Sequence, residues 1–279
     1  MSADILESAI ERLRKAGIES PRLEARLLLA HAMNVSQEDV IAGRTPDAAT
    51  LDRLAALLAR RERREPLAYI LGKREFWSLD FAVGPGVLIP RPESETLIEA
   101  ALKDFPDKKT PLNVLDIGTG SGCLLIAFLK ERPQAHGVGV DISSEALAWA
   151  ERNMRAHGQT NRVSLVRGDS ARTIAGQFDV VLCNPPYVAD AAFASLEPEV
   201  ANYEPAIALK AGKDGLDAYR QLAPQIGEKL RPHGRAYLEL GQGQATDVAA
   251  LFEASGLVVA RIVDDLARVP RCIVAALPQ

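Results

Sequence analysis

One tetrapeptide, Asn184-Pro185-Pro186-Tyr187, has the residue types for holding a ligand NH2 group, and it directly follows the apolar run 179–183. Two consecutive prolines fix φ and remove two N–H donors, so backbone carbonyls stay free to accept hydrogen bonds. The side-chain oxygen of Asn184 adds another acceptor. Tyr187 can stack on the planar group that bears the nitrogen. The structural alternative is a rigid Pro-Pro turn that closes a strand.

Such acceptors matter because an amide or arylamine nitrogen is a poor nucleophile, its lone pair being delocalised. Two acceptors that hold both hydrogens favour a pyramidal nitrogen aimed at an electrophile. Most of the catalysis is then positioning, which can contribute about 7 to 11 kcal/mol in well-oriented pairs. The tetrapeptide therefore predicts group transfer to a conjugated NH2.

A glycine-rich loop upstream predicts the partner of that reaction. Gly118, Thr119, Gly120, Ser121 and Gly122 lie between an apolar run and a helical stretch over 123–131. Glycines let the backbone approach a ligand closely, and a helix N-terminus offers free N–H groups. Asp141 follows Gly122 by nineteen residues, where an acid accepts hydrogen bonds from ribose hydroxyls. The pair indicates a nucleoside cofactor, whereas the loop alone could be a structural turn.

The charge next to the loop narrows the cofactor. Asp116 precedes it, and the spacing is GxGxG rather than the GxGxxG of dinucleotide sites. An acid there repels a pyrophosphate and attracts a cation, which suits the sulfonium and ammonium groups of S-adenosylmethionine. Asp169 and Ser170, after the third predicted strand, lie where the adenine amino group would be in such a fold. A plain turn is the alternative for that pair.

The elements that must position these motifs alternate between strand and helix beyond residue 90. Such alternation is typical of an α/β, doubly wound, Rossmann-like and mostly parallel sheet. Strands are predicted over 112–116, 138–141, 163–166, 180–183, 236–240, 258–263 and 272–276.

The first part of the chain has a different pattern. Helical spacing of apolar residues over 2–64 predicts three or four short helices, and alternation over 75–89 predicts a β-hairpin. The predicted domains are a helical domain 1–75, a hairpin linker 76–90 and an α/β domain 91–279. Predicted helix starts are Ser20-Pro21, Ser36 and Thr50, and predicted ends are Gly17 and Asn34. We interpret Arg60, Arg61, Arg63 and Arg64 as the solvated end of a helix, with contact to an acidic partner as the alternative.

Composition excludes several classes of protein. The chain has 279 residues, 47% hydrophobic and 25% charged, as in ordinary globular proteins. Its three cysteines and four histidines are scattered, so we expect neither disulfides nor a metal site. No apolar run approaches the roughly 18 residues that a membrane helix needs, and we expect a cytoplasmic location. The net charge of −4 makes nucleic acid an unlikely partner.

Taken together, the motifs resemble those of class I S-adenosylmethionine-dependent methyltransferases, and more narrowly the release factor glutamine methyltransferases of the PrmC/HemK family. Several motifs occur in one order: EPLAYILG over 65–72, VLIPRPESE over 87–95, DIGTGSG over 116–122, NPPY over 184–187, Glu204-Pro205 and Asp214-Gly215-Leu216. The resemblance implies methyl transfer to the side-chain amide nitrogen of the glutamine in the GGQ motif of class 1 peptide chain release factors.

By the same resemblance, the glycine loop, Asp141 and the Asp169-Ser170 pair would bind S-adenosylmethionine. The NPPY residues would hold the glutamine, with Asn184 bordering the cofactor too, and the helical domain would help dock the release factor. Arg91 and Glu93 would lie at the mouth of the active site, and a proline-rich connector with a salt bridge is the alternative for them.

Adenine-N6 methyltransferases of DNA or RNA also use NPPY, because the exocyclic amine of adenine is the same kind of conjugated NH2. Such enzymes flip the base out of the stack and hold the strand in a basic groove. Residues 76–279 contain 20 Lys and Arg against 25 Asp and Glu, a net charge of −5. This balance favours a protein substrate over nucleic acid. A third possibility, an inert cofactor-binding module, is disfavoured because every expected catalytic position is filled.

Overall fold

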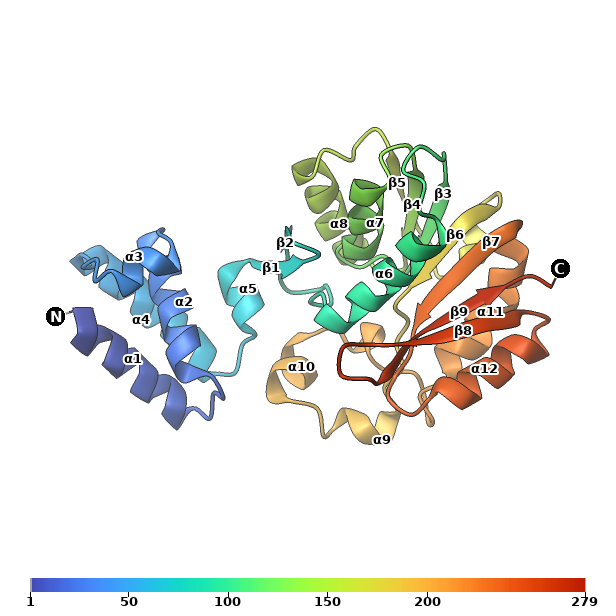
Figure 1. Ribbon diagram of the computed structural model, residues 1–279. Coiled ribbons are helices and arrows are strands. Elements are labelled where there is room, and N and C mark those ends of the chain that lie inside the picture. Colours follow the sequence, from blue (N-terminus) through green and yellow to red (C-terminus); the bar gives the residue numbers. More distant parts are fainter. Residues whose placement is uncertain (1, 279) are drawn as a thin grey trace. The chain divides into compact units, whose positions relative to one another are not determined.

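The computed structural model describes residues 2–278, and these form two compact units (Figure 1). The first unit comprises the chain up to Lys73 together with the later segment Glu197–Tyr203. The second comprises Arg74–Leu196 and the chain from Glu204 onward. The helical unit is therefore discontinuous in sequence, and the predicted domain 1–75 lacks its second segment, Glu197–Tyr203.

The first unit is helical and buries an apolar core. Its core includes Ile10, Leu13, Leu28 and Leu29, which are fully buried and recur at helical spacing. Each such side chain contributes about 1.5 to 3 kcal/mol on burial. Its helices are α1 (Ser2–Lys15), α2 (Pro21–Met33), α3 (Gln37–Ile41), α4 (Ala48–Glu62), α5 (Leu67–Leu71) and α10 (Pro198–Tyr203).

Helix ends in this unit follow local chemistry. Pro21 begins α2 and Asn34 ends it in the left-handed conformation, while Ser36 forms a capping box with Asp39. The predicted start at Thr50 is wrong, because the Asp47 carboxylate caps α4 and accepts from the Thr50 backbone N–H at 2.8 Å.

The sequence suggested that the arginines at the end of α4 are solvated, but Arg61 and Arg64 are held in ion pairs. Arg61 is only 6% exposed, and its guanidinium lies 2.6 Å from Glu24 and 2.7 Å from Glu199. Arg64 lies 2.7 Å from the other oxygen of Glu199. Because both arginines bind a residue of α10, they attach that helix to the first unit.

The hairpin lies earlier in the chain than 76–90. Strands β1 (Lys73–Phe76) and β2 (Leu79–Ala82) pair with each other and are joined by Trp77 and Ser78, both with positive φ, as in a type I′ turn. Residues 83–91 continue without strand structure and reach the pocket described below.

The second unit is a seven-stranded sheet, which confirms the predicted doubly wound α/β fold. The strand order is β5-β4-β3-β6-β7-β9-β8, in which β9 runs antiparallel to both neighbours and the other pairs are parallel. The strands are β3 (Asn113–Ile117), β4 (His136–Asp141), β5 (Val163–Arg167), β6 (Phe178–Cys183), β7 (Leu230–Glu239), β8 (Val258–Asp264) and β9 (Pro270–Ala276).

Two hydrophobic clusters cover the two faces of this sheet. Along β6, Val180 and Leu182 belong to one cluster, and Val181 and Cys183 belong to the other. Such alternation is what a strand buried on both faces requires. Helices α6 (Glu95–Asp104), α7 (Cys123–Glu131) and α8 (Ser144–Ala156) cover the first face, and α11 (Asp217–Lys229) and α12 (Ala245–Ala254) cover the second (Figure 1).

Short elements complete the second unit: η1 (Pro92–Ser94), η2 (Ala171–Thr173), α9 (Asp190–Phe193) and η3 (Ala206–Ala208). The chain leaves β3 toward β4 on one side and β6 lies on the other, so the strand order reverses between β3 and β6. Ligands of open α/β sheets bind at the carboxyl end of this reversal point. Among the described residues, no helix is long and apolar enough to cross a membrane.

Candidate active site

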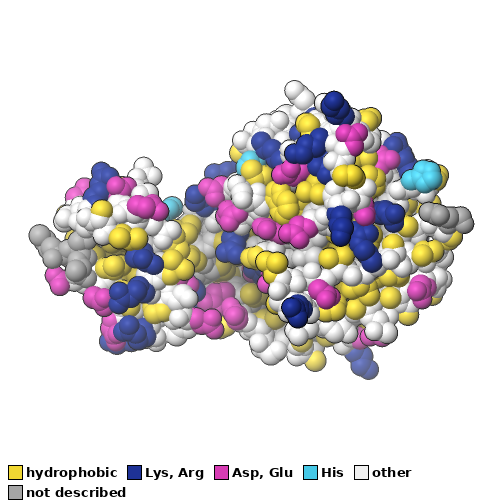
Figure 2. Space-filling view, viewed as in Figure 1, with side chains coloured by type: hydrophobic (Ala, Val, Ile, Leu, Met, Phe, Trp, Pro, Cys, Tyr) yellow, Lys and Arg dark blue, Asp and Glu magenta, His cyan; other side chains and the backbone are white. Residues whose placement is uncertain are grey.

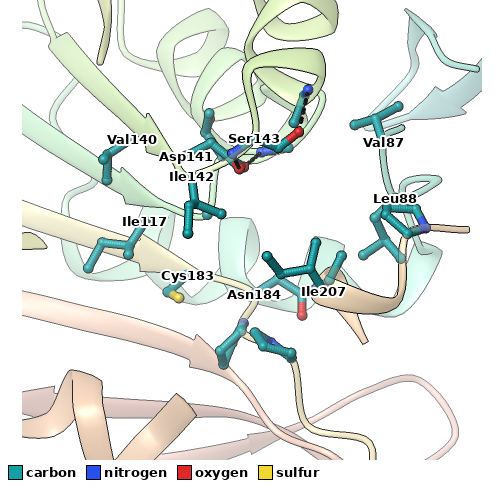
Figure 3. Close-up of a pocket in the computed structure, with 18 of the residues that line it drawn as sticks. Val87, Leu88, Ile117, Val140, Asp141, Ile142, Ser143, Cys183, Asn184 and Ile207 are labelled. Atoms are coloured by element: carbon teal, nitrogen blue, oxygen red, sulfur yellow. Dashed lines mark hydrogen bonds between the residues drawn. The ribbon is translucent and has the colours of Figure 1, made fainter. Parts of the chain in front are cut away.

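A pocket of about 300 Å³ opens where the strand order reverses, entirely within the second unit. Ile117, Val140 and Cys183 reach it from the carboxyl ends of β3, β4 and β6, Leu88 reaches it from a loop and Ile207 from η3 (Figure 3). A mostly apolar cavity with a few polar groups is typical of a small-molecule site. The pocket brings together residues 118–121 of the glycine loop, Asp141, Asp169, Ser170, Asn184, Pro185, Pro186 and Arg91.

The glycine loop is shaped by left-handed backbone. Gly118, Gly120 and Gly122 have φ of 69°, 56° and 80°, a backbone region that residues other than glycine adopt at a cost in energy. Gly118 faces open space, since an added Cβ would meet nothing within 4 Å. Gly122 instead is buried and does not line the pocket, and its Cβ would lie 3.2 Å from Ile126. The predicted cofactor role therefore fits Gly118 and Gly120, whereas Gly122 serves helix packing.

Asp141 ties this loop to β4. Its Oδ2 accepts from the Gly120 backbone N–H at 2.9 Å, and its Oδ1 accepts from the Ser143 backbone N–H at 2.9 Å (Figure 3). A carboxylate has about four acceptor positions, so these two bonds leave lone pairs for a ligand. Asp141 is half-buried and lines the pocket, where an acceptor of hydroxyl groups was expected.

Asp116 lies beneath the loop rather than in the pocket lining. It is fully buried, its Oδ2 accepts from the Thr119 hydroxyl at 2.6 Å, and its Oδ1 has no hydrogen-bond partner among the described residues. Burial raises the pKa of Asp116 to about 7, and nearby Asp141 adds to this effect. An orphaned carboxylate oxygen behind an open glycine loop fits a cationic ligand, so the residues present suit S-adenosylmethionine. Because Asp116 does not line the pocket, the cofactor role predicted for it would be an effect of its charge from behind the loop.

The residues predicted to border an adenine lie in the same pocket. Gly168, Asp169 and Ser170 all line the pocket, with Asp169 exposed and Ser170 half-buried. The backbone N–H of Gly168 donates to the carbonyl of Asp141 at 3.0 Å, so this turn is attached to the end of β4. The exposed hydrophobic residue Ile142, which follows Asp141, lines the same cavity.

At the NPPY end, Asn184 lines the pocket and its orientation is set from behind. Its Nδ2 donates to the hydroxyl of Ser94 at 3.1 Å, which leaves its Oδ1 available to accept. Ser94 in turn donates to the buried carboxylate of Glu239, the last residue of β7. Burial raises the pKa of Glu239, while the Ser94 and Tyr187 hydroxyls lower it.

Tyr187 is placed differently from the prediction. It does not line the pocket, and its hydroxyl donates to Glu239 Oε1 at 2.9 Å. Burial and the neighbouring Glu239 carboxylate raise the pKa of Tyr187 above its usual value, so the phenol stays protonated. The expected stacking on a substrate is therefore not what this geometry provides, because the ring is packed behind the site.

Arg91 and Glu93, predicted at the mouth, separate in the structure. Arg91 lines the pocket and pairs with the buried Glu204 at 2.5 Å, whose other oxygen accepts from the Ile89 backbone N–H at 3.0 Å. Glu93 is exposed and lies outside the lining. The salt bridge considered in the sequence therefore exists, with Glu204 as the partner.

The sequence analysis did not single out two buried carboxylates that hydrogen-bond to residues of the site. Glu204 was quoted only as part of a motif, and Glu239 was not singled out at all. The available signal for Glu239 was a charge at the end of the apolar run 236–240, since a buried carboxylate needs partners. Among the described residues, no group of three or more His, Cys, Asp or Glu side chains could hold a metal ion.

Comparisons with known proteins agree with this arrangement. Residues 4–72 match the family model of the PrmC N-terminal domain, and residues 94–200 match that of the methyltransferase small domain. A methyltransferase structure from Pyrococcus furiosus is 19% identical, with a TM-score of 0.53 over 71% of this chain and 88% of that one, which supports the fold alone.

Sequence relatives are much more similar. A release factor glutamine methyltransferase from Rhodospirillum rubrum is 46% identical over 97% of this chain and 83% of its own length. Another from Caulobacter vibrioides is 41% identical over 95% of this chain and 93% of its own length. These matches confirm the predicted family and S-adenosylmethionine as the cofactor. The chain belongs to the release factor glutamine methyltransferases, a family of S-adenosylmethionine-dependent enzymes.

Proposed function

We propose that this protein transfers a methyl group to the side-chain amide nitrogen of the glutamine in the GGQ motif of class 1 peptide chain release factors. The observation that carries the proposal is the placement of Asn184: its Oδ1 is free at the pocket while its Nδ2 is held by Ser94. The same cavity contains the glycine loop and Asp141. An acceptor for an NH2 group and a nucleoside site thus share one space.

The cofactor supplies an electrophilic methyl group on a sulfonium. On this chain, Gly118 and Gly120 would accommodate it by close backbone approach, and Asp141 would accept from its ribose hydroxyls. Asp116 would favour its positive charge from beneath the loop, and the Asp169-Ser170 turn would border the adenine. The residues of this half are mostly backbone groups and carboxylates, as a cationic nucleoside requires.

The substrate half of the site acts by holding one nitrogen. Asn184 Oδ1 and the backbone carbonyls beside Pro185 and Pro186 would accept the two amide hydrogens. Holding them reduces delocalisation of the lone pair, so that the nitrogen can form an N–CH3 bond while the bond between that methyl group and sulfur breaks to leave a neutral thioether. The nitrogen would then lose one of its two protons to water. Positioning of this kind lowers barriers by about 7 to 11 kcal/mol when both reactants are well oriented.

A protein substrate fits the surface better than nucleic acid. On the face shown in Figure 2, acidic and basic side chains are interspersed rather than gathered into one basic patch. The net charge of the α/β region, residues 76–279, is −5. A protein that binds a nucleic-acid strand draws most of its affinity from neutralising phosphates with Lys and Arg. A region with a net negative charge does not supply that affinity. We also propose that the helical unit docks the release factor and that the enzyme acts in the cytoplasm, where translation ends.

The test is transfer of labelled methyl from S-adenosylmethionine to three acceptors: a class 1 release factor, its Gln→Ala variant at the GGQ motif, and an unmodified DNA duplex. Label on the intact factor alone is expected. Label on DNA would overturn the substrate assignment in favour of an adenine-N6 enzyme, and label on none of the three would reject the proposal.

A further inference from the structure

Glu239 is a buried carboxylate that the mechanism above does not use. It is 1% exposed at the end of β7, and within the described part of the chain no Lys or Arg pairs with it. Instead it receives two hydroxyl donors, Ser94 on Oε2 and Tyr187 on Oε1. Arg271, which forms its salt bridge with Asp265, adds a more distant positive charge that lowers the pKa of Glu239. A buried carboxylate whose hydrogen-bond donors are all neutral is costly, and such groups are more often placed for function than for stability.

The hydrogen bonds around Glu239 have a fixed direction. The Ser94 hydroxyl donates to Glu239 Oε2, and because a hydroxyl has one hydrogen, that hydrogen is committed to Glu239. Toward Asn184 the Ser94 oxygen can then only accept, and the group that faces it at 3.1 Å is the Asn184 NH2. The reverse orientation of the Asn184 amide would bring two oxygens together with no hydrogen between them. The orientation of this amide is therefore determined by Glu239, which acts through the hydroxyl of Ser94.

This direction matters because an asparagine amide is nearly symmetric in shape but opposite in chemistry at its two ends. With Nδ2 on Ser94, the pocket receives an acceptor, Oδ1. With the amide turned over, the pocket would receive a donor, which cannot hold the NH2 of a substrate. The same carboxylate also holds Tyr187, so it supports both ends of the tetrapeptide.

We propose that Glu239 is a positioning residue for methyl transfer: through Ser94 it orients the Asn184 amide so that Oδ1 faces the substrate nitrogen. This inference rests on the proposed function, because it assumes that Asn184 accepts from a substrate NH2. It assigns to Glu239 and Ser94 no contact with the reacting atoms.

Kinetics on four variants test the proposal. Ser94→Ala removes the connection, and Glu239→Gln replaces the acceptor-only group by one that can also donate. Each is expected to lower kcat with the release factor by about 10- to 100-fold, the effect of one misoriented hydrogen bond. The affinity for S-adenosylmethionine should stay within about threefold. Ser94→Thr keeps the hydroxyl and should recover most of the kcat lost in Ser94→Ala.

The matched control is Tyr237→Phe, two residues earlier on β7. It removes another buried hydroxyl that donates to a carboxylate, Asp104, at 2.8 Å, but this bond leads away from the pocket. Its kcat should equal that of the parent. The double variant Ser94→Ala with Glu239→Gln should be no slower than the slower single variant, because both break one chain of bonds. Equal losses in the control, or additive losses in the double variant, would mean that the cluster only stabilises the fold.

A second measurement does not depend on turnover. In protein with 15N-labelled asparagine, the Asn184 side-chain NH2 should exchange slowly in the parent and in Ser94→Thr, and quickly in Ser94→Ala and Glu239→Gln. If the parent methylates no release factor yet this pattern holds, the proposed function fails and the orientation of Asn184 stands. If the parent is active and both variants keep its kcat and its exchange rate, the positioning role is overturned.

Discussion

The two ends of the pocket differ in the groups that form them and in how far apart those groups lie in the sequence. At the cofactor end, the contacts are backbone N–H groups, left-handed glycines and carboxylates that follow strands directly, such as Asp141. At the substrate end, one side chain, Asn184, depends on Ser94 and on a carboxylate from a distant strand. This difference shows that one local segment of sequence can form a site for a common ligand. The site for a particular substrate here needs three separate segments, those of Ser94, Asn184 and Glu239.

The largest effect should come from the substrate end. Asn184→Ala removes the acceptor for the substrate nitrogen, and we expect kcat to fall by at least about 100-fold, as when a positioned hydrogen-bonding group is removed from other active sites. Calorimetric affinity for S-adenosylmethionine should change less than about threefold. An unchanged kcat would erase the difference between the two ends and reject the acceptor role.

At the cofactor end, Asp141→Ala should act on binding. The variant loses both the ribose acceptor and the hydrogen bond to the Gly120 N–H. We expect the Kd for S-adenosylmethionine to rise by about 10- to 100-fold, which corresponds to the loss of one or two hydrogen bonds to a charged group. Calorimetry measures this, with Asp169→Ala as a smaller change at the same end. A Kd equal to that of the parent would contradict the ribose assignment.

A pH dependence should separate the charge beneath the loop from the groups that line it. The pKa of Asp116 is raised to about 7 in the folded protein, so this carboxylate becomes charged as pH rises through 7. Affinity for a cationic ligand should therefore increase between pH 6 and pH 8, by up to about tenfold. In Asp116→Asn this part of the increase should be absent. Identical titrations of the two proteins would show that Asp116 is not sensed by the ligand.

The smallest effect separates two glycines of the same loop. Gly118→Ala and Gly122→Ala both force a side chain into the left-handed region, which costs about 1 to 2 kcal/mol of unfolding free energy. Only Gly118 lines the pocket, so only its variant should also weaken cofactor binding. Denaturant unfolding and calorimetry measure the two quantities, and weaker binding in Gly122→Ala would place that residue at the ligand after all.

The sequence predicted the cofactor end well because its determinants are local. The strand β3, the glycine loop and Asp141 lie within 29 residues, and each follows from alternation, turn chemistry or register. All seven strands of the main sheet were predicted, although the prediction of β7 began at residue 236 and missed its first six residues. Helix α5 was missed because a five-residue helix provides too few turns for periodicity to show.

The substrate end was predicted only as far as its tetrapeptide. Tyr187 was expected at the ligand because an aromatic ring after Pro-Pro resembles a stacking platform, and the partner that holds its hydroxyl, Glu239, lies 52 residues away. The Glu204 partner of Arg91 lies 113 residues away. Pairings at such separations have no periodicity to reveal them, and only the topology of the sheet brings them together.

The segment that completes the helical unit has a consequence for how the chain is made. Glu199, which holds Arg61 and Arg64, follows Arg61 by 138 residues. A ribosome that adds about 5 to 20 residues per second needs roughly 7 to 30 s to cover this distance. During that interval the nascent helices are exposed with Arg61 short of one of its two carboxylates. The helical unit, although first to emerge, can be finished only after most of the sheet has been synthesised.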